Sequence, residues 1–210
     1  MRHQFSVINC QYITQYQKGT TRMKRAILFL LMFIILAATS NAQSIWKTDK
    51  AHSQINFTVS HMVFSEVTGT FKDFDATLVT AKDDFTDAKF EATIKAGSID
   101  TQNENRDKHV KSDDFLNVEK YPEIKFRSTK FEKTGNDTYK ITGDFTLRDV
   151  TKSIVLDTKY KGSLTDSRGT AKSAFKATTT IDRFAFGVAW NKTIESGGLV
   201  AGKDIEVTLL

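Results

Sequence analysis

The stretch that decides the fold is S-Q-I-N-F-T-V-S-H, from Ser53 to His61. Because successive side chains of a β-strand point to opposite faces, Ile55, Phe57 and Val59 share one face with the two end residues, and four polar residues share the other. This alternation predicts a half-buried β-strand. Its inward row ends in histidine, for which a purely apolar core has little use. The pattern therefore indicates a lined interior with a polar end.

Seven further segments repeat this pattern, and their inward faces mix phenylalanines with small residues. Eight strands with short antiparallel links predict an all-β barrel or sandwich, and the mostly charged segment at residues 104–120, which precedes Pro122, predicts one minor helical part. Strands of about nine residues rising about 3.3 Å each enclose an interior roughly 30 Å long. A shift in the alternation at Lys72-Asp73 is typical of a β-bulge. The seven further strands are expected at residues 67–79, 89–98, 124–128, 139–147, 153–160, 171–181 and 204–209.

The first 42 residues have the composition of a leader. Lys24 and Arg25 precede an apolar run at residues 26–38, and small residues follow at residues 40–42. The run is shorter than the roughly 20 residues that span a membrane. Residues 23–42 are therefore predicted to be a cleaved secretory signal peptide, with an uncleaved anchor as the alternative. Residues 1–22 are an upstream extension of doubtful status, since Met23 is an alternative start. The expected location is the periplasm or the exterior of a bacterium.

The charge of the chain is unevenly distributed. There are 30 Lys and Arg residues and 25 Asp and Glu residues, and residues 1–42 contain five of the basic ones and none of the acidic ones. Residues 43–210 therefore carry zero formal net charge, and nucleic-acid binding, which needs a basic face, is not expected. Zero net charge permits a homodimer without predicting one. The only cysteine, Cys10, lies in the leader, so residues 43–210 can form neither a disulfide nor a thiolate site.

A series of short motifs runs through residues 45–210. They are Asp49 with His52-Ser53, I-x-F-x-V-x-H (Ile55–His61), G-x-F-x-x-F (Gly69–Phe74), R-D-x-H (Arg106–His109), D-F-L (Asp114–Leu116), Y-P-E-I-K-F (Tyr121–Phe126), G-D-F-T-L-R-D-V-T-K (Gly143–Lys152) and I-D-R-x-x-F-G (Ile181–Gly187). In their order and spacing they resemble the YceI-like family of exported, polyisoprenoid-binding proteins. The resemblance implies a single domain at residues 43–210, an eight-stranded lipocalin-like antiparallel β-barrel with a helix beside it. It also implies a hydrophobic tunnel for long-chain lipids such as isoprenoid quinones, prenyl phosphates and fatty-acid amides.

Together, the barrel pattern and the resemblance predict an exported protein that sequesters or carries an isoprenoid (a quinone or a prenyl phosphate) or a similar long-chain amphiphile. The expected ligand is this lipid, no cofactor is required, and contact with a membrane or lipid donor is expected to be transient. The family has no settled catalytic constellation, so no catalytic residue is expected. The residues expected to form the hydrophobic lining are Phe57, Val59, Phe71, Phe90, Phe126, Phe145, Phe175, Phe184, Phe186 and Trp190.

Two polar residues, His61 and Arg183, are candidate contacts for a lipid head group. An arginine at a barrel mouth can bind phosphate or carbonyl oxygens, and the alternative is an ion pair that fixes the loop at residues 183–203. For His61 the alternative is a core histidine bonded to a neighbour. The spacing of His52, His61 and His109 does not match a zinc site, so no metal is expected. The two alternative functions are a lipid-modifying enzyme that uses cavity histidines and an unliganded surface interaction module.

Overall fold

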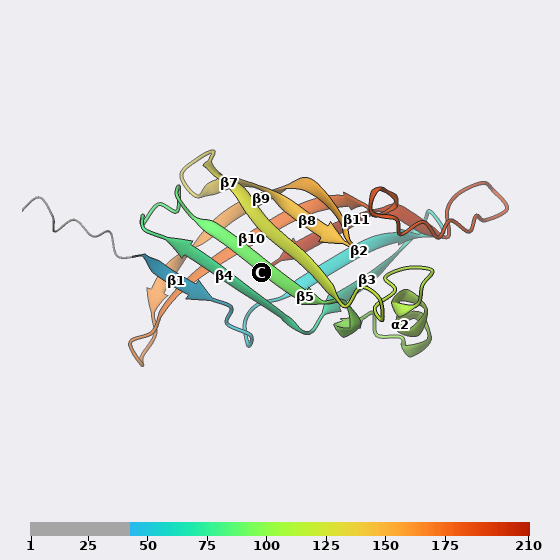
Figure 1. Cartoon of the computed structure of the whole chain (residues 1–210), viewed down its shortest axis with the longest axis horizontal. Coiled ribbons are helices and arrows are strands. Elements are labelled where there is room, and N and C mark those ends of the chain that lie inside the picture. The colour runs from blue at the N-terminus through green and yellow to red at the C-terminus, as the bar shows by residue number, and fades with distance from the viewer. Residues whose placement is uncertain (1–42) are drawn as a thin grey trace, which may run out of the picture. The chain divides into compact units, whose positions relative to one another are not determined.

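In the computed structural model, which describes residues 43–210, one antiparallel β-sheet curls around an interior, with a short α-helix beside one end (Figure 1). The predicted signal peptide and upstream extension lie outside the described residues. Within the described range, no helix combines the length and the apolar character needed to cross a bilayer. The strands are β1 (Ser44–Lys47), β2 (Ile55–His61), β3 (Ser65–Phe71), β4 (Phe74–Thr80), β5 (Lys89–Lys95), β6 (Ile99–Asp100), β7 (Glu123–Lys133), β8 (Thr138–Leu147), β9 (Val150–Thr165), β10 (Ala171–Asp182) and β11 (Ala201–Leu209); the α-helix is α2 (Glu104–Lys111), and two 3₁₀ turns are η1 (Ala96–Ser98) and η2 (Arg183–Phe186).

Two continuous stretches of chain connect strands near opposite ends of this sheet and so close it around the interior. The hydrogen-bonded order is β1-β4-β5-β7-β8-β9-β10-β11-β2-β3-β6, with antiparallel neighbours throughout. β3 runs into β4 through Lys72 and Asp73, and β5 runs into β6 through η1. The two bent strands β3–β4 and β5–β6 pair with each other on both sides of the bend. Eight long strands therefore surround the interior, and the short β1 pairs with β4.

The predicted class, an all-β antiparallel lipocalin-like barrel with one helical segment, is confirmed. The predicted number of eight strands is wrong, because the described sheet has eleven. The alternation gives no sign of the short β1 and β6, and the strand expected at residues 67–79 is divided where its alternation shifts. The segment expected to be helical at residues 104–120 is α-helical only as far as Lys111, because the chain then forms a series of hydrogen-bonded turns.

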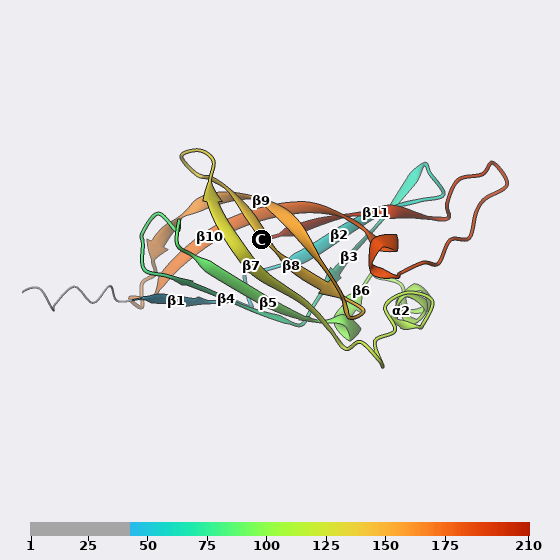
Figure 2. The same ribbon diagram turned by 45° about the horizontal axis from the view of Figure 1, so that its top comes forward.

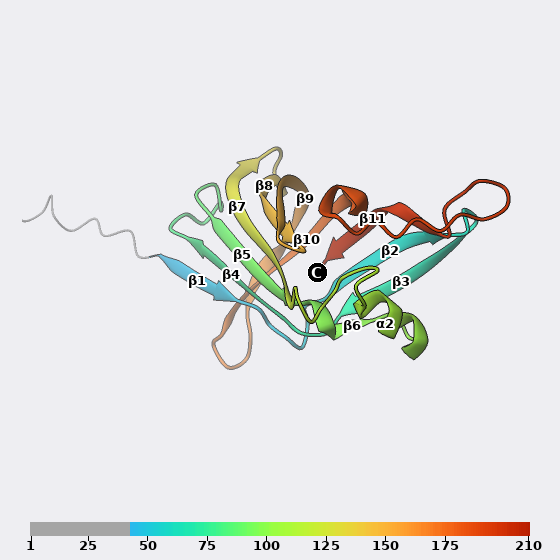
Figure 3. The same ribbon diagram turned by 45° about the vertical axis from the view of Figure 1, so that its right-hand side comes forward.

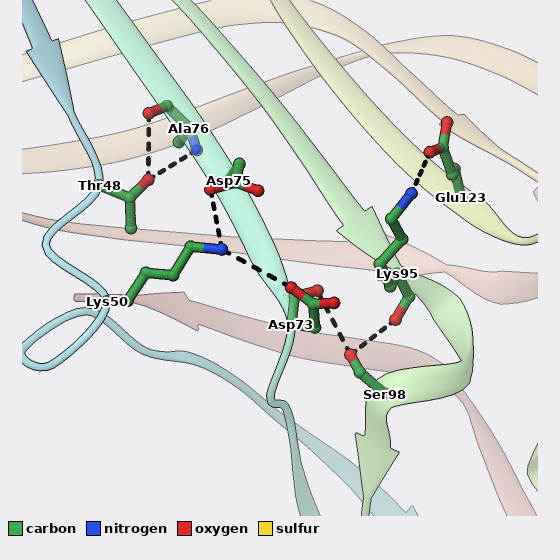
Figure 4. Close-up of polar contacts among 8 residues, drawn as sticks. All are labelled: Thr48, Lys50, Asp73, Asp75, Ala76, Lys95, Ser98 and Glu123. Atoms are coloured by element: carbon green, nitrogen blue, oxygen red, sulfur yellow. Dashed lines mark hydrogen bonds and ion pairs between the residues drawn. The ribbon is translucent and has the colours of Figure 1, made fainter.

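Polar contacts hold the two bent strands together where both of them break (Figure 4). Ser98 Oγ donates to the carbonyl of Lys95 at 2.7 Å and to that of Asp73 at 3.4 Å, and the Lys95 amide donates to the Asp73 carbonyl at 2.9 Å. Nearby, Lys50 Nζ lies 3.0 Å from the Asp75 carboxylate and 3.8 Å from that of Asp73. These bonds satisfy backbone groups that a regular ladder would pair, so the bend is a fixed part of the fold.

An ion pair beside this bend makes the stability of the fold depend on pH. Lys95 Nζ donates to Glu123 Oε1 at 2.5 Å (Figure 4), and Lys125 Nζ lies 3.0 Å from Oε2 of the same carboxylate. The hydrogen bond from Lys95, followed by that from Lys125, lowers the pKa of Glu123 from 4.5 to about 2. Since the folded-state pKa lies below the unfolded one, the stabilisation is present above about pH 4.5 and is lost as the pH falls towards 2.

We therefore expect the melting temperature to fall between about pH 5 and about pH 2, and to fall less in a Glu123→Gln variant. Some loss remains in the variant, because hydrogen bonds from Lys172 and His52 also lower the pKa of Asp49 to about 2. Thermal unfolding followed by circular dichroism measures both curves. A Lys95→Gln variant is expected to lose less as well, because it removes the partner of the same carboxylate. Equal losses in the wild-type protein and in Glu123→Gln would contradict the prediction.

The interior has a solid half and a hollow half. At the end that carries the β4–β5, β7–β8 and β9–β10 connections (Figure 2), the ring of Phe85 packs 5.1 Å from that of Phe175 and 5.4 Å from that of Tyr160. The buried Tyr139 hydroxyl donates to the carbonyl of Asp84 at 3.0 Å. The half nearer α2 instead contains a large cavity. The same strands therefore build a filled core at one end and a container at the other.

Candidate functional site

The candidate site is the cavity of about 1610 Å³ in the hollow half of the barrel. Side chains of β2, β3, β5, β6, β7, β8, β10 and β11 form its walls. The β2–β3 turn, α2 and the loop at residues 187–200, here called the mouth loop, lie together at this end of the molecule (Figure 3). Most of the lining is aliphatic or aromatic. The cavity is therefore suited to an apolar ligand that is too large for the usual small-molecule pocket of about 300–1,000 Å³.

The wall formed by β2 and β11 follows directly from their alternation. Ile55 pairs with Leu209, Phe57 with Val207 and Val59 with Ile205. Five of these six side chains line the cavity, and Leu209 packs against the buried residues around it. Residues between them, such as Asn56 and Thr208, belong to the opposite face of the sheet. The regular alternation of β2 and its partner thus supplies one complete side of the container.

The structure places five of the ten predicted lining residues on the cavity and the other five elsewhere. Phe57, Val59, Phe71, Phe145 and Trp190 line the cavity. Three others belong to the solid half: the rings of Phe90 and Phe126 lie 5.9 Å apart, and Phe175 packs on Phe85. Phe186 packs behind the lining at 5.3 Å from Phe145, and Phe184 lies beneath the Arg183 guanidinium at 4.4 Å. That the residues on the cavity bind a ligand stays a prediction.

Arg183 is a buried cation at the mouth of the cavity, with only 3% of its surface exposed. Its Nε, Nη1 and Nη2 donate to the carbonyls of Gly202, Val188 and Ala201 at 2.7–2.8 Å. Burial lowers the pKa of the guanidinium, and the charge of Asp182 partly offsets this shift. The expected alternative of an ion pair with its neighbour is not what fixes the loop. Arg183 instead ties both ends of the mouth loop through backbone carbonyls, while Asp182 lies 3.7 Å from Lys203.

Three hydrogen bonds leave donors of Arg183 unused. A guanidinium has five N–H groups, so two remain after the three carbonyls are satisfied. The other charged residues on the lining, histidines apart, are Arg106, Lys192 and Glu195, and these four groups together give the cavity a net positive charge. This contrasts with the neutral balance of residues 43–210 as a whole. The mouth can therefore accept an oxygen-rich or anionic group, whereas the deeper walls cannot.

An aromatic cluster connects the mouth loop to α2. The ring of Trp190 lies 5.5 Å from that of His109 and 5.2 Å from that of Phe115, and His109 Nε2 is 2.8 Å from Asp114 Oδ2. Arg148 adds a second tie, because its Nη1 donates to the carbonyls of Phe115 and Gly187 at 2.8 Å. The mouth loop is thus held at both ends by Arg183 and a second time near its start by Arg148 and the aromatic cluster.

Sequence reasoning missed the contribution of α2 to the lining. Arg106, His109 and Val110 all reach the cavity from this helix. Arg106 is held by Thr101, to whose Oγ1 and carbonyl it donates at 2.8 and 2.7 Å. The available signal was the apolar minority of the charged segment, which includes Val110 and Phe115. Its spacing predicts a helix but not the part of the barrel that the helix covers.

Of the three histidines in residues 43–210, two lie on the cavity and one does not. His61 and His109 line the cavity, whereas the exposed His52 pairs with Asp49 at 3.0 Å. In residues 43–210, no group of three or more His, Cys, Asp or Glu side chains is placed to hold a metal ion.

Comparison with known proteins gives the family. The model of the YceI-like domain matches residues 46–210. The chain belongs to the YceI-like family. A UPF0312 protein of Pectobacterium atrosepticum is 36% identical over 190 residues, which cover 89% of this chain and 95% of that protein. The protein YceI of Escherichia coli is 39% identical over 158 residues, covering 74% of this chain and 82% of its own.

Solved structures have the same fold. The YceI protein of Campylobacter jejuni is 32% identical and superposes with a TM-score of 0.59 over 78% of this chain and 93% of its own. Burkholderia cenocepacia BcnA, at 18% identity, gives a TM-score of 0.67 over 77% of this chain and 96% of its own. A polyisoprenoid binding domain from Saccharophagus degradans, at 14% identity, gives 0.54 over 80% and 95%. The last two show likeness in fold alone.

In this YceI-like protein, the motifs from different parts of the sequence meet at the mouth of the cavity. R-D-x-H supplies Arg106 and His109 from α2, D-F-L supplies Phe115 and I-D-R supplies Arg183. The guanidinium of Arg183 lies 5.7 Å from the ring of Phe115, which joins two of these motifs directly. The mouth thus brings together residues of three motifs that are far apart in the sequence.

Proposed function

We propose that this YceI-like protein is an exported lipid-binding protein that sequesters or carries an isoprenoid (a quinone or a prenyl phosphate) or a similar long-chain amphiphile in its cavity. The observation that carries the proposal is a cavity of about 1610 Å³ with mostly apolar walls and a cationic mouth. The Saccharophagus degradans domain of the same fold, described as polyisoprenoid binding, gives the proposal an independent precedent. Family membership adds the fold and the arrangement of the motifs.

Burial of the apolar part of the ligand would supply most of the affinity. Each Å² of apolar surface removed from water contributes about 25 cal/mol, from which the ordering of the chain is subtracted. The β2–β11 wall, with Phe57, Val59 and Val207, offers such a surface along the length of the cavity. The polar end of the ligand would lie at the mouth, where the free N–H groups of Arg183 and the ring of His61 are the proposed contacts.

We also propose a location and partners for the protein. The proposed location is the periplasm or the exterior of a bacterium, and the leader composition of residues 23–42 supports this part of the proposal. The expected partners are the lipid itself and, transiently, a membrane or a lipid donor, and no cofactor is required. Fractionation of cells that express the full chain tests the location, and N-terminal sequencing of the exported protein tests cleavage after residue 42.

The decisive experiment identifies what the cavity holds. Protein purified without detergent is extracted with organic solvent, and the extract is analysed by mass spectrometry, where we expect a stoichiometric long-chain lipid. The delipidated protein is then titrated with decylubiquinone and with geranylgeranyl phosphate, and at least one is expected to raise the melting temperature. If no lipid is extracted and neither compound stabilises the protein, both the carrier proposal and its lipid ligand are refuted, and an unliganded interaction module is left.

A matched pair of variants tests whether the cavity is the binding site. Val207→Gln places an amide in the apolar wall and is expected to weaken binding of the stabilising compound by about tenfold or more. Thr208→Gln changes the next residue of β11, which belongs to the opposite face of the sheet, and is expected to leave binding unchanged. Equal affinities of the two variants in a fluorescence titration would place the site elsewhere.

The enzyme alternative rests on His61 and His109, which both line the cavity. The carrier proposal expects the bound lipid to be recovered unchanged after prolonged incubation. An enzyme would convert it, and the double variant His61→Gln with His109→Gln would abolish the conversion while leaving the lipid content intact. Mass spectrometry of the extracted lipid over time distinguishes the two functions.

A further inference from the structure

Three consecutive apolar residues form an exposed lip at the cavity mouth. In the β2–β3 turn, Met62, Val63 and Phe64 are 40%, 67% and 86% exposed. Among the described residues, the other large exposed hydrophobic side chains occur singly along the chain, and none of them lines the cavity. All three lip residues do line it. One continuous apolar surface therefore runs from the interior of the barrel over its rim and out to the solvent.

The backbone of the lip has a conformation that its residue types disfavour. Met62 has a φ of 51° and Val63 a φ of 74°, in the left-handed region that favours asparagine and glycine. For a residue with a side chain this conformation costs about 1–2 kcal/mol, and a β-branched valine is particularly unsuited to it. Stability of the hairpin therefore does not explain these two residues. Strain at an exposed position points instead to a use for the side chains.

Contacts with the mouth loop hold the lip in place. The Met62 amide donates to the carbonyl of Val200 at 2.9 Å, and Ser65 Oγ donates to the carbonyl of His61 at 2.9 Å. Val63 lies so close to Gly198 that a Cβ at that glycine would collide with it. In Figures 1 and 3 the turn and the loop lie side by side at the same end of the molecule. The exposed side chains are thus presented on a supported rim.

The charges that accompany the lip indicate the kind of surface it fits. Glu66 follows it in β3, and Lys192 and Glu195 lie on the same mouth. Of the cations that make the mouth positive, Arg183 is buried and Arg106 is half-buried and bonded to Thr101. The three exposed charges, one lysine and two glutamates, form no basic patch that would attract an anionic surface. The lip is therefore suited to the apolar interface of a bilayer rather than to electrostatic attachment.

We propose that Met62, Val63 and Phe64 insert into the interface of a lipid bilayer and dock the cavity mouth on the acyl chains. A lipid then passes between membrane and cavity along a continuous apolar surface and does not cross water, where exposure of its long apolar chain would be most costly. The transfer of lipid in this inference rests on the proposed function. The docking itself requires no bound lipid.

The test is flotation of the delipidated protein with vesicles of pure phosphatidylcholine. We expect wild-type protein to float with the vesicles at low and high salt alike, since no charge attraction is involved. Phe64→Ser is expected to reduce the partition coefficient by about tenfold or more, because the change removes a large apolar side chain from the interface. The matched control is Leu164→Ser, which changes a residue that is 61% exposed. Leu164 lies at the end of β9 beside the β9–β10 connection, at the solid end of the barrel, so this variant is expected to float like wild type.

Two further variants keep the outcome clear. The double variant Met62→Asn with Val63→Gly relieves the backbone strain and removes two apolar side chains. We expect this variant to float poorly although its melting temperature is not lowered. Val207→Gln lies outside the lip and should still float although it binds lipid poorly, which separates failure of docking from failure of the carrier proposal. Docking is refuted if Phe64→Ser floats like wild type, if wild-type binding needs anionic lipid or disappears in salt, or if Phe64→Ser alters only self-association in analytical ultracentrifugation.

Discussion

Replacement of Phe85 by alanine is expected to lower the free energy of unfolding by about 3–5 kcal/mol, which is the range for removal of a buried aromatic side chain. Phe85 is only 4% exposed, and its ring packs edge-on against that of Phe175 and obliquely against that of Tyr160. It lies in the connection between β4 and β5 and closes the solid end of the barrel. Its loss leaves a void that strands on several sides of the barrel cannot fill without moving.

A matched truncation in the hollow half provides the control. Phe57→Ala removes the same atoms, but one side of the Phe57 ring already faces the cavity, so fewer packing contacts are lost and no new void is enclosed. We expect a cost of about 1–2 kcal/mol there. Urea unfolding of the delipidated proteins, followed by circular dichroism, gives both values. Equal costs for the two variants would mean that the two halves do not differ in packing.

Replacement of Arg183 by methionine is expected to release the mouth loop. The variant keeps a long side chain but removes the donors for the carbonyls of Val188, Ala201 and Gly202. Hydrogen bonds from a charged group are worth about 1.5–3 kcal/mol each. Part of this loss is recovered when the loop opens to water, and we expect a net loss of about 3 kcal/mol in the free energy of loop opening. Amide hydrogen exchange in the mouth loop would then accelerate roughly 100-fold.

Two reporters and two controls make this prediction specific. The amides of Val188 and Val200 donate to the carbonyls of Arg183 and Lys192, so their exchange rates report opening of the loop. Lys203→Met removes a nearby exposed cation that pairs with acidic side chains, and its effect is expected to stay within about 0.5 kcal/mol.

Arg183→Lys keeps the charge, but a single nitrogen cannot reach three carbonyls, so most of the effect of the methionine variant is expected to remain. Exchange rates in Arg183→Lys equal to wild type would show that charge, and not the hydrogen-bond geometry, holds the loop.

The barrel was predictable because its strands alternate so regularly. The parity of Ile55, Phe57 and Val59 assigns one wall, and the same reasoning applies around the sheet. The short β1 and β6 escape this reasoning, since two to four residues carry too little pattern. The shift at Lys72-Asp73 marks the right position, but a shift in parity cannot distinguish a local bulge from a bend at which a strand acquires new neighbours.

The candidate site was predictable only in part, for a physical reason. Alternation shows that Phe57 and Phe126 both point inward, but whether the inside is filled depends on side chains from other elements. Phe85, which helps to fill the solid half, lies in a connection where no alternation exists. Likewise, Arg183 was recognisable as an unusual cation, but its three carbonyl partners are backbone groups about which side-chain identity carries no information.

The asymmetry between the two halves limits what such a container can do. Packed aromatic rings block the solid end of the barrel, so a ligand of the proposed kind would enter and leave through the mouth alone. Its apolar chain would enter first, and its polar end would leave first. Loading and unloading are then the same reaction run in opposite directions. Net movement of the ligand of the proposed carrier would therefore follow the difference in its chemical potential between the sites of loading and unloading. If the protein is the proposed carrier, it acts as a shuttle and not as a conduit.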